Sequence, residues 1–179
     1  NTMNTTTVCV VEKLRAMGLS FFVDPHIPDV LVLPPTPECR AQIQDMVTSH
    51  QIILQDKSSC FSALCLVFGF DHNERDGVFL DACASPGNKT SHLASLLAQP
   101  ATKNTNIVHA LDKSLDRFNL LQRRMGELVG AAVSCHNLDF FEASSKTFKN
   151  VRAILLDPSC SGSGMISNHM EATRDPMFV

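Results

Sequence analysis

The chain has 179 residues, of which 44% are hydrophobic and 18% charged, and its formal net charge is −3. This composition is typical of a folded globular domain and excludes wholesale disorder. No apolar run of about 18 residues occurs, so we expect no membrane span. The mildly acidic charge weighs against a strongly basic nucleic-acid-binding surface, although local basic positions exist.

Cysteine usage indicates an environment of reduced thiols. The spacing of the cysteines contains no C-x-x-C pair, so we expect no metal site. No charged-then-apolar leader opens the sequence, which favours a nuclear or cytosolic protein. The chain begins with Asn1 and shows no evident terminus at Val179, so we expect it to be part of a longer protein. The seven cysteines are at positions 9, 39, 60, 65, 83, 135 and 160.

The first 54 residues combine short predicted elements with a proline-rich connector. Thr6 or Thr7 can cap a first helix, and Gly18 is a typical stop. Five prolines between residues 24 and 37 interrupt regular structure. The expected elements are a helix over 7–17, strands over 19–23 and 30–33, a short helix over 37–47, and a strand or turn over 51–54.

From residue 55 onward longer elements are expected, and from Val78 the pattern changes to that of an α/β domain. Asp56 or Ser58 should cap a helix that places Phe61, Leu64, Cys65 and Phe68 on one face. Strands and amphipathic helices then alternate, which predicts a parallel sheet with helices on both faces. The expected strands are 78–80, 107–111, 132–135 and 153–156, and the helices are 89–98 and 114–129, the latter with Leu115, Phe118, Leu121, Met125 and Leu128 toward the core.

An acid follows each of the four predicted strands: Asp81, Asp112, Asp139 and Asp157. For a single aspartate, capping of the next helix or turn is the commoner use. Because ligands of open α/β sheets bind beyond the carboxyl ends of the strands, four such acids favour a ligand crevice.

The loop after the first of these strands indicates which ligand fits. Asp112 lies where dinucleotide-binding folds place an acid on the ribose, which suits NAD as well as S-adenosyl-L-methionine. Neither G-x-G-x-x-G nor the Walker phosphate loop follows Leu80, which disfavours an NAD-linked enzyme. A loop with Pro86 and Gly87 favours a small zwitterionic tail over two phosphates.

Two sequence blocks carry a family resemblance. DACASPGNKTSHLA, residues 81–94, and LLDPSCSGSG, residues 155–164, resemble motifs I and IV of the Sun-domain RNA cytosine-5 methyltransferases. The nearest branch is the NSUN-type enzymes acting on large-subunit ribosomal RNA, where PGNKTSH replaces the commoner PGGKT. The resemblance extends from about Gln55 to Gly164.

The resemblance implies an α/β, Rossmann-like, S-adenosylmethionine-dependent methyltransferase fold, incomplete here, with an N-terminal α+β remnant. Residues 1–54 would be an RNA-positioning remnant and connector, and residues 55–179 a partial catalytic domain. The implied reaction is methyl transfer to C5 of cytosine in RNA, with large-subunit rRNA as the expected partner and the nucleolus as the expected location. The alternative is a non-catalytic RNA-binding or ribosome-assembly module on the same fold.

Site residues follow from the same resemblance. Asp157 would face both the cofactor and the target base. Cys160 would help to release the product, because the attacking cysteine of this family lies in a later Thr-Cys motif that does not occur in these 179 residues. The chain alone would then be inactive. The implied cofactor contacts are Cys83, Ala84, Ser85, Pro86, Gly87, Asn88, Lys89, Asp112, Arg117, Asp139 and Asp157.

Three basic side chains lie near these motifs without an assigned role. Arg123 and Arg124 are expected on a solvated helix face. His92, on the helix that follows the first motif, is expected to serve helix packing or to lie on the surface.

Overall fold

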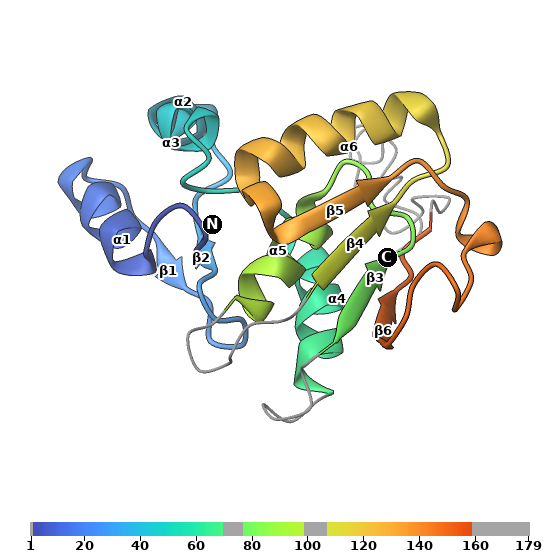
Figure 1. Cartoon of the computed structure of the whole chain (residues 1–179). Helices are drawn as coiled ribbons and strands as arrows, with labels where there is room; N and C mark the ends of the chain where they lie inside the picture. Colours follow the sequence, from blue (N-terminus) through green and yellow to red (C-terminus); the bar gives the residue numbers. More distant parts are fainter. Residues whose placement is uncertain (1, 70–76, 99–106, 159–179) are drawn as a thin grey trace, which may run out of the picture.

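The computed structural model describes residues 2–69, 77–98 and 107–158. The N-terminal unit consists of short elements, shown in blue to cyan in Figure 1. The predicted first helix is confirmed, with Thr6 as its cap, whereas the predicted 37–47 helix is broken into two at Ile43. The elements are α1 (Thr7–Ala16), β1 (Phe22–Val23), β2 (Leu31–Val32), α2 (Pro37–Gln42) and α3 (Gln44–Thr48), with β1 and β2 antiparallel.

The predicted alternation after residue 55 is confirmed. The four strands form one parallel sheet in the order β5-β4-β3-β6, so the chain moves outward through β4 and β5 and then returns to the other side of β3. The elements are α4 (Lys57–Phe68), β3 (Val78–Asp81), α5 (Asn88–Leu97), β4 (Ile107–Leu111), α6 (Leu115–Leu128), η2 (Gly130–Ala132), β5 (Val133–His136), η3 (Phe140–Glu142) and β6 (Val151–Leu155).

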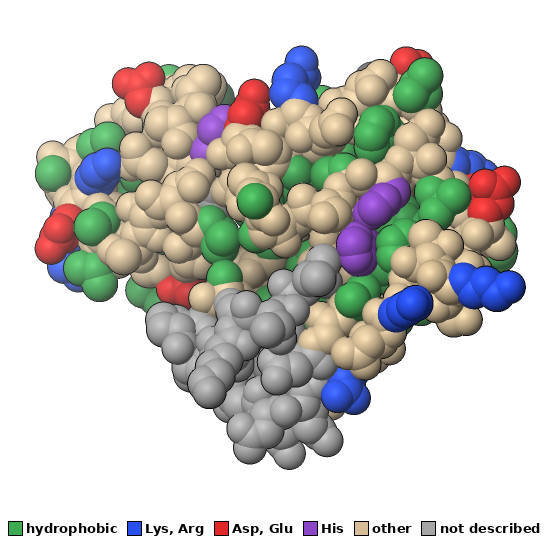
Figure 2. Space-filling model, viewed as in Figure 1, with side chains coloured by type: hydrophobic (Ala, Val, Ile, Leu, Met, Phe, Trp, Pro, Cys, Tyr) green, Lys and Arg blue, Asp and Glu red, His purple; other side chains and the backbone are tan. Residues whose placement is uncertain are grey.

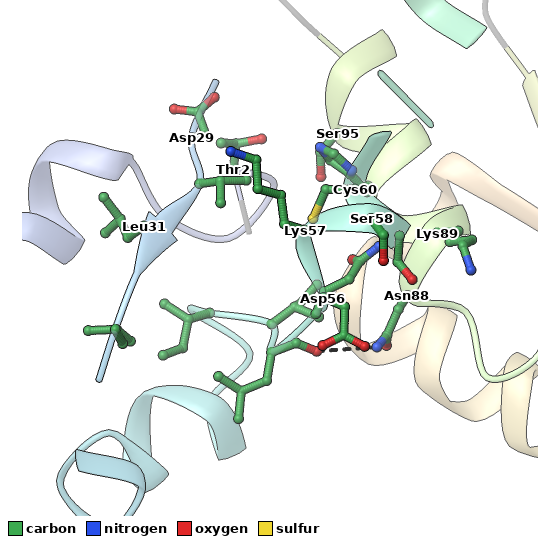
Figure 3. A pocket seen from close by; sticks show the side chains of 18 of the residues that line it. Thr2, Asp29, Leu31, Asp56, Lys57, Ser58, Cys60, Asn88, Lys89 and Ser95 are labelled. Atoms are coloured by element: carbon green, nitrogen blue, oxygen red, sulfur yellow. Dashed lines mark hydrogen bonds between the residues drawn. The ribbon is translucent and has the colours of Figure 1, made fainter. Parts of the chain in front are cut away.

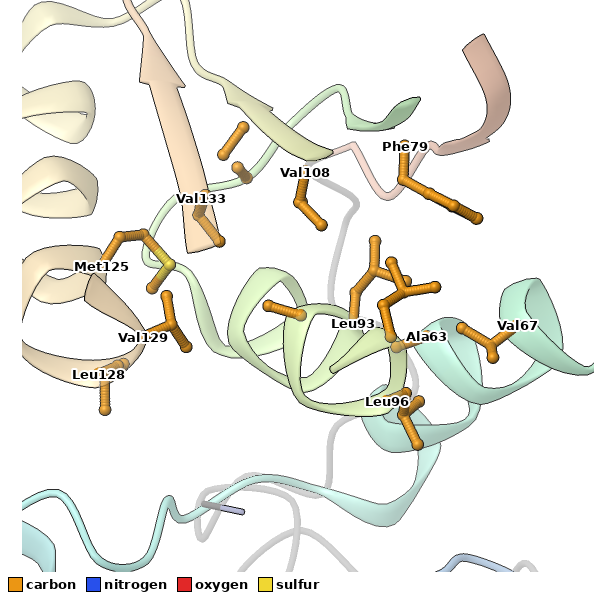
Figure 4. Close-up of a cluster of buried hydrophobic side chains, with 14 of the residues drawn as sticks. Ala63, Val67, Phe79, Leu93, Leu96, Val108, Met125, Leu128, Val129 and Val133 are labelled. Atoms are coloured by element: carbon orange, nitrogen blue, oxygen red, sulfur yellow. The ribbon is translucent and has the colours of Figure 1, made fainter. Parts of the chain in front are cut away.

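The main core lies between one face of this sheet and helices α4, α5 and α6. Phe79, Val108 and Val133 of the strands meet Leu93 of α5 and Met125 of α6 in one buried cluster (Figure 4). Burying a side chain such as Phe79 or Leu93 contributes about 1.5–3 kcal/mol. The α/β, Rossmann-like architecture inferred from the sequence is therefore present.

The opposite face of the sheet differs from the prediction of helices on both faces. Within the described part of the chain, it is covered by the segment 137–150, whose Phe148 packs on Leu80 and Leu111. His109 and His136 lie side by side beneath Phe148, with Nδ1 and Nε2 2.8 Å apart. Hydrophobic and histidine side chains are accordingly visible on this face in Figure 2.

Two predicted helix faces need correction. In α4 the buried side chains are Cys60, Ala63, Leu64 and Val67, so the apolar face is shifted by one position; Phe61, Cys65 and Phe68 are exposed. The helix is apolar almost all round, so its sequence periodicity does not single out the buried side. In α6 the predicted stripe is buried at Leu121, Met125 and Leu128, whereas Leu115 in the first turn is 60% exposed.

The N-terminal unit is joined to the α/β domain by a buried carboxylate. Asp24 Oδ2 lies 2.6 Å from Lys57 Nζ, and Asp24 Oδ1 accepts the backbone N–H groups of His26 and Ile27. The hydrogen bond from Lys57 lowers the pKa of Asp24. Ile27 enters the main core cluster, so apolar packing accompanies the ion pair. None of the described helices has the length and apolar character needed to cross a membrane.

Gly87 forms the start of α5 with a backbone that suits glycine alone. Its φ is +101°, and a Cβ at this position would lie 2.4 Å from Met125 Cε and 3.1 Å from Leu121 Cδ1. L-residues rarely adopt this φ, and both neighbours belong to the buried face of α6. The start of α5 can therefore lie this close to α6 because glycine has no side chain.

We predict that Gly87→Ala destabilises the protein by about 1–3 kcal/mol, because it combines backbone strain with displacement of Met125. Urea denaturation measures the change. The matched control is Gly126→Ala in α6, where a Cβ meets nothing within 4 Å. That substitution should be neutral or stabilising by up to about 1 kcal/mol. Equal stability of the two variants would contradict the steric argument.

Candidate functional site

The four predicted strand-end acids lie along one edge of the sheet. Asp81 ends β3, and Asp112 follows β4 directly; Asp157 and Asp139 lie two and three residues beyond β6 and β5. Their order across the sheet is therefore 139, 112, 81, 157. The strand order reverses between β3 and β6, which is where open α/β sheets bind ligands.

The strand–helix loop, residues 82–87, crosses this edge and is held from both sides. Ala82 N–H donates to Leu155 O of β6, and Ala84 N–H donates to Leu111 O of β4, both at 2.9 Å. The loop therefore satisfies backbone donors with the two strands that flank β3. Since both flanking strands hold it, the loop has a defined path over the site.

Asp112 anchors the same loop through its side chain. The carboxylate accepts Ser114 N–H at 3.1 Å, Arg117 Nε–H at 3.0 Å and Ser85 N–H at 3.4 Å. Arg117 also donates from Nη2 to Ser85 O at 2.7 Å. The side chain of Asp112 is only 6% exposed, because the guanidinium covers it. A carboxylate offers about four acceptor positions, and these three donors occupy three of them.

Asp81 is the most deeply buried acid of the site. It is 1% exposed, and its Oδ2 accepts the Thr90 hydroxyl at 2.7 Å while Oδ1 accepts Cys83 N–H at 3.4 Å. Burial raises the pKa of Asp81 to about 6, against the lowering effect of the Thr90 hydrogen bond. The Thr90 contact fixes the first turn of α5 to the end of β3.

Lys89 and Asp157 meet across the point where the strand order reverses. Lys89 Nζ lies 2.5 Å from Asp157 Oδ2, although the two residues are 68 positions apart in the sequence. Their side chains are 24% and 48% exposed, so solvent or a ligand can reach them. The two sequence blocks that carried the family resemblance are thus joined by a direct contact.

A cleft of about 1030 Å³ lies in front of these residues. This volume is at the upper end of the range for small-molecule sites. Gly87, Asp112 and Asp139 do not line it, so the structure does not bring every predicted contact into one cavity. Figure 3 shows the cleft, whose walls include residues 28–35 and further residues of the N-terminal unit, residues 52–60, Asp81, Cys83–Pro86, Asn88, Lys89, His92, Arg117, Asp157 and Pro158.

Asp139 has a local structural role in this structure. Its Oδ1 accepts Phe141 N–H at 3.0 Å and so caps η3. Its Oδ2 lies 3.7 Å from Lys113 Nζ. The side chain is 32% exposed, so a contact with an adenine stays a prediction.

The thiols next to the cleft are poorly suited to attack a base. Burial raises the pKa of Cys60 and of Cys83, and the carboxylate of Asp81 adds to the effect at Cys83. Because the thiolate is the nucleophile, a raised pKa lowers reactivity. Cys160 lies outside the described residues. Within the described ranges, no three His, Cys, Asp or Glu residues are grouped so that they could hold a metal ion.

Sequence reasoning missed two side chains at this site. Arg124 was expected in solvent, but it is half-buried and donates from Nη2 to Asn88 Oδ1 at 2.7 Å. His92 lines the cleft, and its Nδ1 is buried without a partner among the described residues. Burial lowers the pKa of His92. The Arg124 contact has no signal in the sequence, because its partner Asn88 is 36 positions away.

The comparison with known proteins agrees with this geometry. Residues 69–177 match the family described as 16S rRNA methyltransferase RsmB/F. The chain belongs to this RsmB/F family. The match includes the strand–helix loop, Lys89 and Asp157, which are the parts that the structure brings together at the sheet edge.

Individual relatives of this RsmB/F family member point to one branch. The chain is 39% identical over 168 residues to a 28S rRNA (cytosine-C(5))-methyltransferase of Mus musculus, covering 90% of this chain and 33% of the mouse protein. It is 34% identical over 156 residues to a 26S rRNA (cytosine-C(5))-methyltransferase of Caenorhabditis elegans, covering 85% and 33%. The branch inferred from the sequence is confirmed. The chain spans about a third of the length of these relatives.

A solved structure supports the fold. The methyltransferase homologue protein from Pyrococcus horikoshii superposes with a TM-score of 0.68 at 22% identity, over 96% of this chain and 53% of that one. At this identity the likeness establishes the architecture.

We predict that Asp81→Asn changes how stability depends on pH. The pKa of Asp81 rises from 3.8 in the unfolded chain to about 6 in the folded one. The folded state therefore binds the extra proton between these values, and stability falls as pH rises from about 4 to 6. The difference corresponds to on the order of 3 kcal/mol. The asparagine can still accept the Thr90 hydroxyl, so Asp81→Asn should gain stability relative to wild type at pH 7.5 more than at pH 5.

Urea denaturation at both pH values measures this effect. Asp116→Asn on the exposed start of α6 is the control for loss of a surface carboxylate. If the free energies of unfolding of Asp81→Asn and wild type differ by the same amount at pH 5 and pH 7.5, the buried carboxyl is not the source of the pH dependence.

Proposed function

We propose that this protein transfers a methyl group from S-adenosyl-L-methionine to C5 of a cytosine in large-subunit rRNA. The observation that carries the proposal is the Lys89–Asp157 contact at the reversal of strand order, beneath a loop fixed by β4 and β6. The RsmB/F match and the names of the relatives support the same reaction. A nuclear, nucleolar location follows from such a substrate.

The cleft suits the chemical groups of this cofactor. Its walls carry charged groups of both signs, as a zwitterionic methionine tail requires; these are Lys89, Arg117, Asp81 and Asp157. The N-cap of α5, Gly87, provides no side-chain cap, so N–H groups of the first turn can bind a carboxylate. The residues proposed to hold the cofactor are Cys83, Ala84, Ser85, Pro86, Gly87, Asn88, Lys89, Asp112, Arg117, Asp139 and Asp157.

Asp112 and Arg117 act together in this proposal. Asp112 holds the strand–helix loop through Ser85 and has one acceptor position left for a ribose hydroxyl. Arg117 covers that carboxylate and reaches the cleft, so it controls access to Asp112. S-adenosyl-L-methionine, when bound, supplies an electrophilic methyl group on a sulfonium centre.

Asp157 and Lys89 are proposed to orient the target base. Carboxylates recognise cytosine by accepting from its N4 amino group. Asp157 Oδ2 is bound to Lys89, which leaves Oδ1 for that amino group, and the remaining Lys89 donors can reach a base carbonyl. The base must leave its stack or be single-stranded to reach them.

The attacking thiol stays a prediction. Cys60 and Cys83 have raised pKa values, which supports a nucleophile elsewhere. The family resemblance assigns attack to a Thr-Cys motif and product release to Cys160. Residues 1–54 are proposed to position the RNA, because they form one wall of the cleft.

We predict that Asp157→Asn in the full-length protein lowers methyl transfer at least about 100-fold, because an amide can present a donor where cytosine N4 needs an acceptor. Transfer of tritiated methyl from S-adenosyl-L-methionine to in vitro transcribed large-subunit rRNA measures the rate. Calorimetry should also show weaker binding of S-adenosyl-L-methionine, because Asp157 and its partner Lys89 are both proposed cofactor contacts. The rate is therefore measured at saturating cofactor, where the loss reports on the target base.

Asp116→Asn, an exposed acid on α6, is the matched control and should retain wild-type activity. Wild-type protein that binds the cofactor but methylates no RNA would instead support the non-catalytic RNA-binding or ribosome-assembly module. Full activity of Asp157→Asn would remove the proposed role of that carboxylate.

A further inference from the structure

Asn88 joins three separate segments through one side chain. Its Oδ1 accepts from Arg124 Nη2 of α6 at 2.7 Å, and its Nδ2 donates to Leu54 O at 3.3 Å. The partners are 36 residues ahead of it and 34 residues behind it in the sequence. Figure 3 shows the side chain turned toward the connector near Asp56, whereas Lys89 projects to the other side.

Buried polar groups surround this bridge. Arg124 Nε and Gln55 Nε2 are both buried without a hydrogen-bond partner among the described residues. Gln55 follows Leu54 directly, so the unpartnered donors lie at the two ends of the Asn88 bridge. The hydrogen bond from Arg124 is partly buried and the one to Leu54 is exposed, so Asn88 links a buried helix position to the surface of the connector.

Asn88 is adjacent to a residue that is proposed to bind the target base. Asn88 is the first residue of α5, and the next residue is Lys89, whose Nζ contacts Asp157. On the other side, Leu54 is the end of the connector from the N-terminal unit and precedes α4. Helices α4 and α5 pack together in the main core, so they move little relative to each other. A shift of the connector is therefore transmitted to the loop at Asn88.

We propose that Asn88 is a positioning residue that couples the N-terminal unit to the strand–helix loop. This inference rests on the proposed function. RNA held against the N-terminal unit fixes the connector at Leu54, the connector fixes the Asn88 amide, and the amide fixes the loop and Lys89. Binding of RNA and of the cofactor then favour each other, and by linkage the two effects are equal. A glycine at this position makes neither side-chain contact.

Aspartate at position 88 tests the connector link alone. Asn88→Asp keeps an oxygen for Arg124 but removes the N–H donor to Leu54 O. A negative charge in the first turn of α5 favours the helix, so the melting temperature should be unchanged or higher. A purely structural role of Asn88 predicts the opposite. A loss of coupling in Asn88→Asp without a loss of melting temperature therefore indicates a positioning role and not a purely structural one.

The measurement is the affinity of the full-length protein for S-adenosylhomocysteine, by calorimetry, with and without in vitro transcribed large-subunit rRNA. The coupling factor is the ratio of the two affinities of one variant. A direct effect of the new charge on the cofactor tail cancels in that ratio. We expect a factor of at least about 5 for wild type and less than about 2 for Asn88→Asp.

Two neighbouring arginines of α6 provide a matched pair. Arg124→Ala removes the other contact of Asn88 and should also reduce the coupling factor. Arg123→Ala, exposed one position earlier, should leave it at the wild-type value. An unchanged factor in Asn88→Asp, or an equal loss in Arg123→Ala, overturns the inference.

Failure of the coupling can be distinguished from failure of the proposed function. Wild-type protein that binds S-adenosylhomocysteine and methylates RNA, but with a coupling factor near 1, overturns this inference and leaves the proposed function intact. Wild-type protein that binds no S-adenosylhomocysteine overturns both.

Discussion

The backbone of the strand–helix loop must find hydrogen-bond partners, and the two strands beside β3 provide two of them. Ala84 N–H binds Leu111 O of β4, and Ala82 N–H binds Leu155 O of β6. A buried backbone donor without a partner is strongly unfavourable, so the loop path requires both neighbours. The parallel order β5-β4-β3-β6 is therefore a condition of the site as well as of the fold.

Much of this arrangement can be predicted from the sequence because it depends on local patterns. Alternating strands and helices after residue 77 predict a parallel sheet, and acids after the strands predict a ligand edge. Asp81, Asp112 and Asp157 lie at that edge as expected. The sheet and the placement of the acids are predicted correctly because the carboxyl ends of parallel strands share one side of a sheet whatever the details of packing.

Other features depend on contacts between distant segments and have no local pattern. The buried face of α4 is shifted to Ala63 and Val67 because small side chains allow close approach to α5, whereas the larger Phe61 and Phe68 remain outside. Arg124 resembles a solvated helix residue until Asn88, 36 positions away, is placed beside it. In both cases the tertiary partner decides the outcome, and periodicity does not identify it.

Gly87 has a consequence for which side chains fit at two positions. The terminal methyl of Met125 occupies the space that any side chain at position 87 would need. A side chain at 87 therefore requires a backbone that tolerates a positive φ and a shift of the flexible end of Met125. The choice of residue at the start of α5 is thereby linked to packing in the middle of α6, and a smaller side chain at 125 should lessen the cost of a substitution at 87.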